Sequence, residues 1–437
     1  MSKCGYITQK KFSIGFPDAS TMEENWGSSA WKHQEIAKLM LDEESPPLNP
    51  SKCTGRVFYE QLKNSTQTYR DEIHDIYFGG KFQYNDLVYG NVMGVYASEE
   101  AVDWLFKIQN EFCIPISLTL NQLNVPPALY SGDVLDKLIA YIGGFYDRGL
   151  RSCTIGNVHL MRMNILQRKF PDMVWKNTVN HIVSNTQMVV DYIEIGYNFI
   201  QLDRSLNRNM EELKSIRKYV DSYNKKHQKN IILGLLVKEE CLPYCPFKRE
   251  HDDIQELFGS GKDNYWKNLG QYTCNRWRKN PYHRLPRHGT DLYWVGIDTF
   301  KEYAELIDVF KWSGRLNTNL LPDSILDKGE VLFNCYGVNV EKTPFMVSSF
   351  SEIIEQGLEP LQIWERMWMN RKMYHSCGNL EQLKILTNND LFRSAEIYML
   401  EQVLKNCRSQ CYRCHLCEEV FGLSPIDSLL VLRKDTP

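Results

Sequence analysis

The sequence has no long hydrophobic run. No stretch approaches the roughly 18 consecutive apolar residues of a membrane-spanning helix, and the longest aliphatic run, at 231–237, has the length of a buried strand. The first residues, MSKCGYITQKKFSIGF, contain no apolar run of signal-peptide length. We therefore expect no membrane span and a cytoplasmic, reducing environment in which thiols are free or metal-bound.

Common hydrolase motifs are also absent. The chain contains neither Gly-x-Ser-x-Gly nor His-Glu-x-x-His. It has no internal repeat and no low-complexity tract, and its net charge of -3 gives no overall attraction to nucleic acid. With 437 residues, of which 43% are hydrophobic and 24% charged, the composition is that of a globular protein with a large core.

Short apolar runs alternate with amphipathic segments over the first 320 residues. Helical periodicity is clearest at 99–112, 133–149 and 209–227, and Asn207 or Asn209 could cap the third helix. The expected strands lie at 12–16, 73–79, 114–120, 151–156, 179–183, 198–203, 230–237, 291–297 and 307–312. This alternation predicts an α/β fold with a parallel sheet, and eight or nine strands fit a (β/α)8 TIM-type barrel. A doubly wound open sheet is the alternative.

The last hundred or so residues differ in character from this alternating part. Segments 350–376 and 388–407 have helical patterns, and a cysteine-rich run follows them. We therefore predict two domains, a barrel over 1–325 and a helical, cysteine-rich extension over 326–437.

Cysteine is plentiful, and seven of the 13 cysteines fall into two groups. In the first group, Cys241 and Cys245 come just after the expected strand 230–237, and Cys274 follows in the next long loop. Loops after strands form the active face of a barrel, and thiolates at this spacing favour a metal or an iron–sulfur cluster over disulfides. Three cysteines would leave one position open for substrate, and Cys335 is a candidate fourth ligand.

The second group stands near the end of the chain as Cys-x3-Cys-x2-Cys-x2-Cys. Its members are Cys407, Cys411, Cys414 and Cys417. The spacing is similar to a ferredoxin ligand run, while a zinc knuckle using His415 is the alternative. Spacing alone does not separate iron–sulfur from zinc, nor show whether the two groups share one centre. For both groups the structural alternative is ordinary buried or disulfide-bonded cysteine.

Five polar residues near strand ends are predicted to bind substrate or take part in catalysis. Asp203 ends the expected strand 198–203. Arg249 and His251 follow the cysteine pair, where arginine could hold a carboxylate at two points and histidine could transfer a proton near neutral pH. Lys311 and Arg315 lie at the end of the expected strand 307–312 and could bind an anion.

The stretch 275–289, NRWRKNPYHRLPRHG, mixes five Arg or Lys residues with Trp277 and Tyr282. Basic residues interleaved with aromatic ones suit a path for single-stranded RNA, and they suit equally a lid over an anionic small molecule. A solvated loop is the third interpretation.

The order of these features resembles the peptidase U32 family. The similarity runs from 179–216 through 230–251 and Cys274 to 307–315. The matching elements are the acidic–basic step Asp203–Arg204, the helix segment Glu211–Ile216, the pair Cys241 and Cys245, and Lys311 with Arg315. The chain departs from the family pattern in its close Cys-x3-Cys, where better-known members have a wider spacing, in its unassigned fourth cluster ligand and in the added run Cys407–Cys417. The substrate and the number of clusters therefore stay open.

The resemblance implies a (β/α)8-type barrel and a [4Fe–4S] cluster held by four cysteines. Members of this kind support oxygen-independent hydroxylation of ubiquinone precursors or of tRNA and rRNA bases. We therefore expect an iron–sulfur oxidoreductase that hydroxylates, or modifies in a related way, a biosynthetic intermediate or a nucleobase, with a partner redox or family protein. The alternatives are a zinc-dependent hydrolase or peptidase and an RNA-binding accessory protein with a zinc knuckle.

Overall fold

The chain forms a closed barrel of eight parallel strands in a computed structural model. The structure describes residues 11–16, 55–64, 67–92, 96–236, 248–259 and 297–311. Around the barrel the strands follow the order β1-β10-β9-β8-β7-β6-β5-β2. Their bounds are β1 (Lys11–Gly15), β2 (Ile73–Gly79), β5 (Ile116–Leu120), β6 (Ser152–Ile155), β7 (Val174–Lys176), β8 (Phe199–Gln201), β9 (Ile232–Leu236) and β10 (Val309–Lys311). The predicted (β/α)8 fold class is thereby confirmed.

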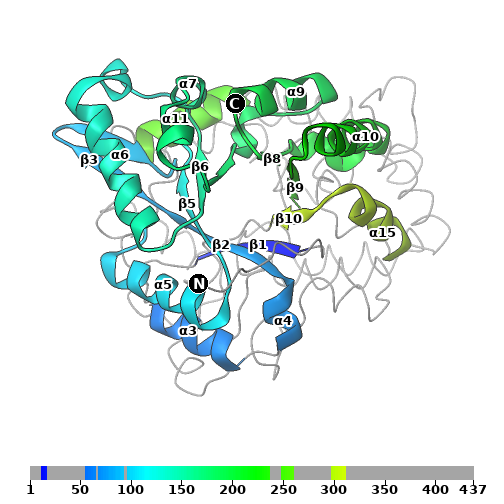
Figure 1. The fold of residues 1–437 in the computed structure, drawn as a ribbon, viewed down its shortest axis with the longest axis horizontal. Coiled ribbons are helices and arrows are strands. Elements are labelled where there is room, and N and C mark those ends of the chain that lie inside the picture. Colours follow the sequence, from blue (N-terminus) through cyan, green and yellow to red (C-terminus); the bar gives the residue numbers. More distant parts are fainter. Residues whose placement is uncertain are drawn as a thin grey trace, which may run out of the picture.

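Helices connect successive strands and surround the barrel (Figure 1). They are α3 (Gly55–Asn64), α4 (Gln67–Glu72), α5 (Glu99–Phe112), α6 (Gly132–Asp147), α7 (Val158–Arg162), α8 (Ile165–Lys169), α9 (Thr186–Ile195), α10 (Met210–His227), α11 (Lys248–Gly259) and α15 (Ile297–Leu306). Short 3-10 turns are η2 (Pro127–Tyr130), η3 (Val179–His181) and η4 (Arg204–Arg208), and β3 (Lys81–Tyr84) pairs antiparallel with β4 (Leu87–Gly90). No described helix has both the length and the apolar character needed to cross a membrane.

The predicted helices form where local capping supports them. Helix α10 begins after Asn209, whose side chain accepts a hydrogen bond from the Glu212 N–H, and it ends at Gln228 in the left-handed region (φ 52°). Helix α5 begins after Ser98, whose side chain accepts from the Ala101 N–H. Each cap satisfies one of the backbone donors that a helix leaves open at its start.

One predicted strand is wrong. Residues 179–183 contain η3, and the strand of this βα unit is β7, Val174–Lys176. Sequence periodicity missed β7 because it is three residues long and its inward-facing Lys176 interrupts the apolar pattern. Of the expected strand 291–297, residues 291–296 lie outside the described residues, as do the predicted domain boundary at 325 and the whole C-terminal extension.

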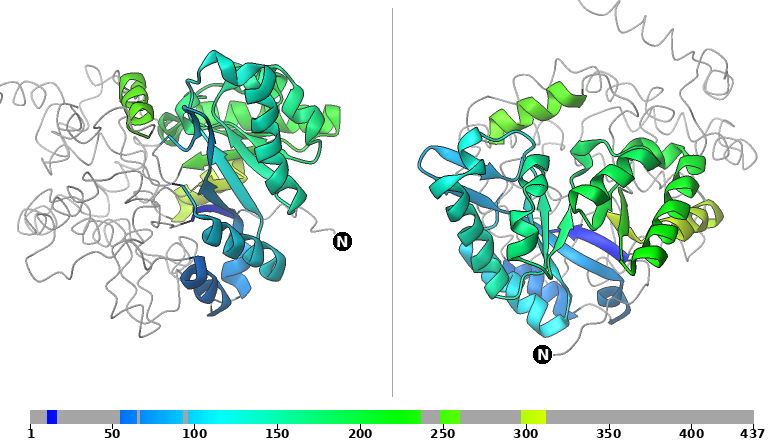
Figure 2. Two further views of the ribbon diagram at one scale, coloured as in Figure 1. Left: turned by 90° about the vertical axis from the view of Figure 1, so that its left-hand side faces the viewer. Right: turned by 45° about the horizontal axis from the view of Figure 1, so that its top comes forward.

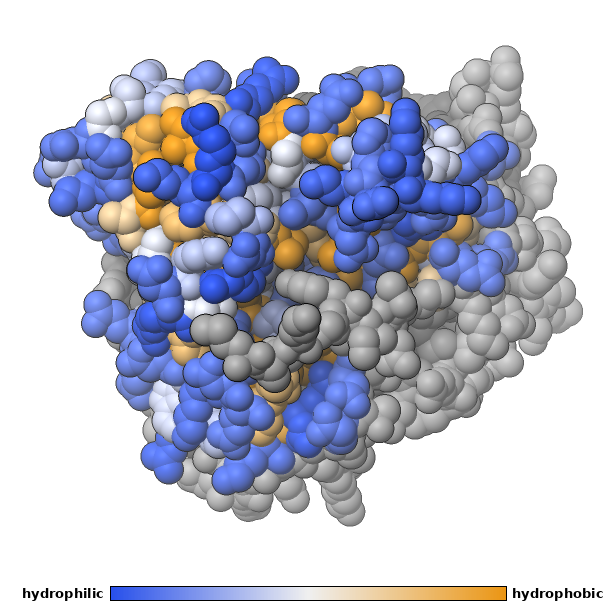
Figure 3. All heavy atoms as spheres, viewed as in Figure 1, coloured by the Kyte–Doolittle hydropathy of each residue, from blue (hydrophilic) through white to orange (hydrophobic). Residues whose placement is uncertain are grey.

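The apolar core lies between the strands and the helices. Along β5, Ile116, Leu118 and Leu120 belong to this core, whereas Ser117 and Thr119 alternate with them and face the barrel interior. In the space-filling view the described helices present mainly hydrophilic side chains, with apolar ones visible between them (Figure 3). The main apolar core is therefore outside the strands, while a smaller apolar cluster of Phe199, Ile232 and Val309 lies on the side of the strands that carries Lys176.

Candidate active site at the carboxyl end of the barrel

Polar side chains follow four neighbouring strands at the carboxyl end of the barrel. After β5, β6, β7 and β8 the chain places the buried residues Asn121, Gln122, Asn157, Asn177, Thr178, Asp203 and Arg204. Parallel strands bring their carboxyl ends to one end of the barrel, where barrel enzymes bind their substrates. Buried polar groups need hydrogen-bond partners, so the contacts of these residues define the geometry of the candidate site.

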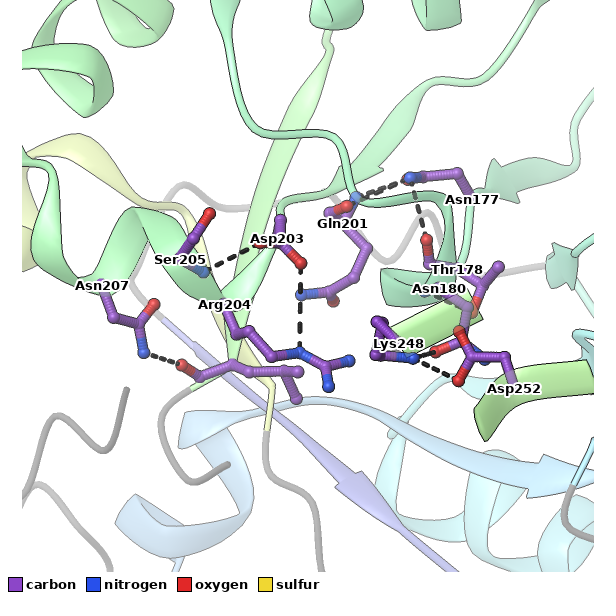
Figure 4. A network of polar contacts seen from close by, with 11 residues as sticks. Asn177, Thr178, Asn180, Gln201, Asp203, Arg204, Ser205, Asn207, Lys248 and Asp252 are labelled. Atoms are coloured by element: carbon purple, nitrogen blue, oxygen red, sulfur yellow. Dashed lines mark hydrogen bonds and ion pairs between the residues drawn. The ribbon is translucent and has the colours of Figure 1, made fainter. Parts of the chain in front are cut away.

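The loop after β8 is held by Asp203 (Figure 4). One carboxylate oxygen accepts a hydrogen bond from the Ser205 N–H at 3.0 Å, and the other lies 4.0 Å from Nε of the buried Arg204. In the same turn, Asn207 Nδ2 donates to the carbonyl of Leu236 at 2.7 Å. This last contact ties the β8 loop to the final residue of β9.

The side-chain amide of Asn177 connects the loop after β7 to β8 by two hydrogen bonds. Asn177 Oδ1 accepts from the Gln201 N–H at 2.5 Å, and Asn177 Nδ2 donates to the Gln201 carbonyl at 3.1 Å. Farther along this loop, His181 Nε2 contacts the Gly156 carbonyl at 2.6 Å. Burial lowers the pKa of His181 to about 4, despite this opposing hydrogen bond, so the ring is neutral near pH 7 and donates its Nε2–H.

The loops after β5 and β6 pack closely together. A Cβ atom on Gly156 would come within 2.5 Å of the Asn121 backbone, so glycine is required for this approach. Asn121 Oδ1 accepts from the Val92 N–H at 2.9 Å, and Asn157 Nδ2 donates to the Leu123 carbonyl at 2.8 Å. These side chains fix the rim of the barrel on this side.

Helix α11 lies across two of these loops. In the side view of Figure 2 it stands apart from the ring of helices, at one end of the barrel. Its Lys248 Nζ donates to Asn180 Oδ1 at 3.3 Å and forms an ion pair with Asp252. At the other end, Glu256 accepts hydrogen bonds from the Leu123 N–H and from Asn124 Nδ2, the latter at 3.0 Å. Burial raises the pKa of Glu256, although these hydrogen bonds oppose the shift.

The barrel interior contains a buried ion pair. Lys176 on β7 contacts Asp75 on β2, and the Ser13 hydroxyl of β1 donates to Asp75 at 2.5 Å. Burial alone would raise the pKa of Asp75, but attraction to Lys176 and His74, with the two hydrogen bonds, outweighs it and holds that pKa below its ordinary value. Asp75 is therefore ionised at neutral pH.

Four of the five predicted catalytic residues lie in the described part of the chain. Asp203 belongs to the polar network, and Lys311 ends β10 with its ammonium 4.5 Å from the centre of the Tyr77 ring. Both Arg249, which is exposed, and His251, which is half-buried, lie on α11. Arg315 lies outside the described residues.

The predicted metal ligands also lie outside the described residues: Cys241, Cys245, Cys274, Cys407, Cys411, Cys414 and Cys417, together with the basic stretch 275–289. Within the described ranges, no group of three or more His, Cys, Asp or Glu side chains could hold a metal ion. The iron–sulfur and zinc assignments therefore stay predictions.

Sequence reasoning missed the residues by which α11 contacts the barrel. Lys248, Asp252 and Glu256 recur at every fourth position, which is the spacing of one helix face, and this was the available signal. It also missed the interior residues Asp75 and Lys176, since nothing in a single sequence pairs two charges 101 positions apart.

Comparisons with solved structures find similarities at low sequence identity and low TM-score. The U32 peptidase Mk0906 matches with 14% identity and a TM-score of 0.37, over 56% of this chain and 89% of that one. The carboxyl transferase domain of Rhizobium etli pyruvate carboxylase, solved with 3-hydroxypyruvate, matches with 8% identity and a TM-score of 0.35, over 98% of this chain and 61% of that one. An alpha-amylase from Lactobacillus plantarum matches with 8% identity and a TM-score of 0.28, over 53% of this chain and 62% of that one.

One of these solved structures is thus a U32 peptidase. The chain spans less than two thirds of the carboxyl transferase and amylase chains. No protein-family model and no curated protein matches the sequence. At these identities the structural similarities concern the fold alone.

Proposed function

We propose that this chain is a barrel enzyme with an iron–sulfur centre, which modifies a small molecule or a nucleobase at the carboxyl end of the barrel. One observation supports the location: the segment that carries Cys241 and Cys245 leaves and rejoins the described structure at this end. It leaves after Leu236, whose carbonyl accepts from Asn207, and it rejoins at Lys248, which contacts Asn180. Both anchor points belong to the polar network of the candidate active site.

In this proposal the described residues bind and orient the substrate. Lys311 brings a positive charge to the end of β10, and Arg249 and His251 stand on the helix that follows the cysteine pair. Asp203 positions η4 through its hydrogen bond to the Ser205 N–H. Cys241, Cys245 and Cys274 would hold the centre, which would supply electron transfer of the U32 type, while the C-terminal cysteines would hold a second cluster or zinc.

Metal and acid-labile sulfide analysis of anaerobically purified protein tests the proposal. We expect iron and sulfide in comparable amounts, with visible absorption that bleaches in air. Both should be lost or strongly reduced in Cys241→Ala and Cys245→Ala. The matched control is Cys113→Ser, since Cys113 is exposed at the end of α5 and far along the chain from both groups.

Colourless anaerobic protein without iron would contradict the proposal. Zinc without sulfide would instead favour the hydrolase or peptidase. Repeating the measurement on Cys414→Ala separates one centre from two. Two centres are indicated if Cys414→Ala loses one part of the metal and Cys241→Ala loses the other part.

A further inference from the structure

Helix α11 is joined to two loops at the carboxyl end of the barrel, with one set of contacts toward each of its ends. Lys248, its first residue, contacts Asn180 in the loop after β7. Glu256 contacts Leu123 and Asn124 in the loop after β5, about 12 Å farther along the helix. Strand β6 lies between β5 and β7 in the barrel, so α11 spans the width of one intervening strand.

The two ends of α11 differ in charge. Lys248 forms an ion pair with Asp252, so the charges at the first end balance. At the second end, Asn124 Nδ2 lies 3.0 Å from a carboxylate oxygen of Asp253 and 3.0 Å from one of Glu256. Within the described part of the chain, neither of these two carboxylates forms an ion pair. Two like charges that converge on one amide repel each other, so the second end is the weaker attachment.

A proton on this carboxyl pair removes the repulsion and keeps the contacts. A neutral carboxyl group retains an oxygen that accepts from the Leu123 N–H, and its own O–H becomes a donor. Burial raises the pKa of Glu256, its hydrogen bonds oppose the shift, and the charge of Asp253 adds to it. From the barrel side, the titratable group that interacts with Glu256 is the Tyr89 phenol, whose pKa burial raises, so it is uncharged near pH 7.

We propose that α11 is a pH-sensitive strap at the candidate active site, attached to the loop after β5 while Asp253 and Glu256 share a proton and released when both are ionised. The attached state binds this proton more tightly than the released state, in which Glu256 has its ordinary pKa of 4.5. Attachment is therefore strongest at low pH and weakens as the pH rises through the raised pKa of Glu256. Release frees the loop after β5 and opens this side of the barrel to substrate. The inference rests on the proposed location of the active site and does not depend on the iron–sulfur centre.

Hydrogen exchange of the full-length protein at about pH 5.5 and about pH 8 tests this inference, with rates corrected for the intrinsic effect of pH. We expect the amides at 121–124 to be protected about threefold or more strongly at the lower pH, which corresponds to a pKa shift of about half a unit. The amides at 213–220, in the middle of α10, are the internal reference. Their protection should change by a clearly smaller factor.

Isosteric variants separate the carboxyl pair from other effects of pH. Glu256→Gln keeps an acceptor for the Leu123 N–H but cannot ionise, so it should protect 121–124 about equally at both pH values. Asp253→Asn removes the neighbouring charge and should raise the protection at the higher pH. The matched control is Glu250→Gln, at an exposed position of the same helix, which should behave like the wild type.

Equal protection of 121–124 at both pH values in the wild type would overturn the inference. So would a wild-type pH dependence in Glu256→Gln, or an equal change in the reference amides, which would indicate global unfolding. The two proposals can fail separately. Iron-free protein with pH-dependent protection would contradict only the proposed function, and an iron–sulfur protein without that dependence would contradict only this inference.

Discussion

Asp75 shows how a single buried charge is stabilised inside the barrel. It is 1% exposed, and removing a carboxylate from water without compensation would be strongly unfavourable. The Lys176 ammonium and the Ser13 hydroxyl supply that compensation from strands on two other sides of the interior. Breaking such a pair is more damaging than replacing both members, since it leaves one buried charge without its partner.

We therefore expect Lys176→Met to lower the free energy of unfolding by about 3–5 kcal/mol. The double variant Asp75→Leu/Lys176→Met should lose less than the sum of its single variants, because no charge is left unpaired. Urea unfolding at neutral pH measures the free energy of unfolding of the single and double variants. The control is the exposed pair Arg148–Asp103, for which Asp103→Asn should change the free energy of unfolding by less than about 1 kcal/mol. Additive losses at Asp75 and Lys176 would contradict this account.

The pH dependence of the pair has a definite sign. The pKa of Asp75 is lowered in the folded protein, so the unfolded chain binds its proton first as the pH falls. The stability contributed by Asp75 is complete above its ordinary pKa of 3.8 and is lost as the pH falls through the lower, folded value.

Helix α11 illustrates what an element contributes beyond its own hydrogen bonds. Its first residue, Lys248, contacts the loop after β7, and Glu256, two turns later, contacts the loop after β5. One helix face thus joins two loops of the candidate active site. The intervening Arg249 is exposed.

Removal of the Glu256 carboxylate should loosen the rim of the barrel. In Glu256→Ala the N–H groups of Leu123 and Asn124 lose their acceptor, which should lower the free energy of unfolding by about 1–3 kcal/mol. Hydrogen exchange of the amides at 121–124 should become faster. Glu250→Ala, at an exposed position of the same helix, should change neither quantity. Unchanged exchange at 121–124 in Glu256→Ala would show that α11 does not hold this loop.

At the scale of the whole molecule, the barrel closes through β10. This strand pairs with β1 through Lys11 and Val309, and with β9 through Gly234 and Val309. The last described strand thus joins the first one, and without it both neighbours would be open edges. All eight strands lie before residue 312, which places the complete barrel within the predicted domain 1–325.

We expect a fragment of residues 1–325 to retain a folded barrel. Its far-ultraviolet circular dichroism should show one cooperative thermal transition. The fragment 1–306 ends with α15 and lacks β10, so it should show no cooperative transition. A fragment 1–325 that does not fold would mean that the barrel needs residues 326–437, against the predicted domain division.

The sequence predicted the barrel because the patterns that indicate its strands and helices each depend on residues close together in the chain. Alternating apolar runs and amphipathic helices predicted seven of the eight strands near their observed places, and Asn209 does cap α10. Strand β7 was missed because three residues with an inward-facing lysine carry too weak a pattern. Of the predicted catalytic residues, Asp203 lies in the network and Arg249 is exposed. Their catalytic roles stay predictions.

Only the tertiary structure decided which distant residues meet. Lys176 reaches Asp75 across the interior, Glu256 reaches Leu123, and Gln201 comes next to Gly234. Such contacts depend on strand register and on barrel closure, which bring together positions that are far apart in the chain. Hydrophobic periodicity depends on neighbours within a few residues, so it fixes elements and their order. It does not fix which side chains those elements place face to face.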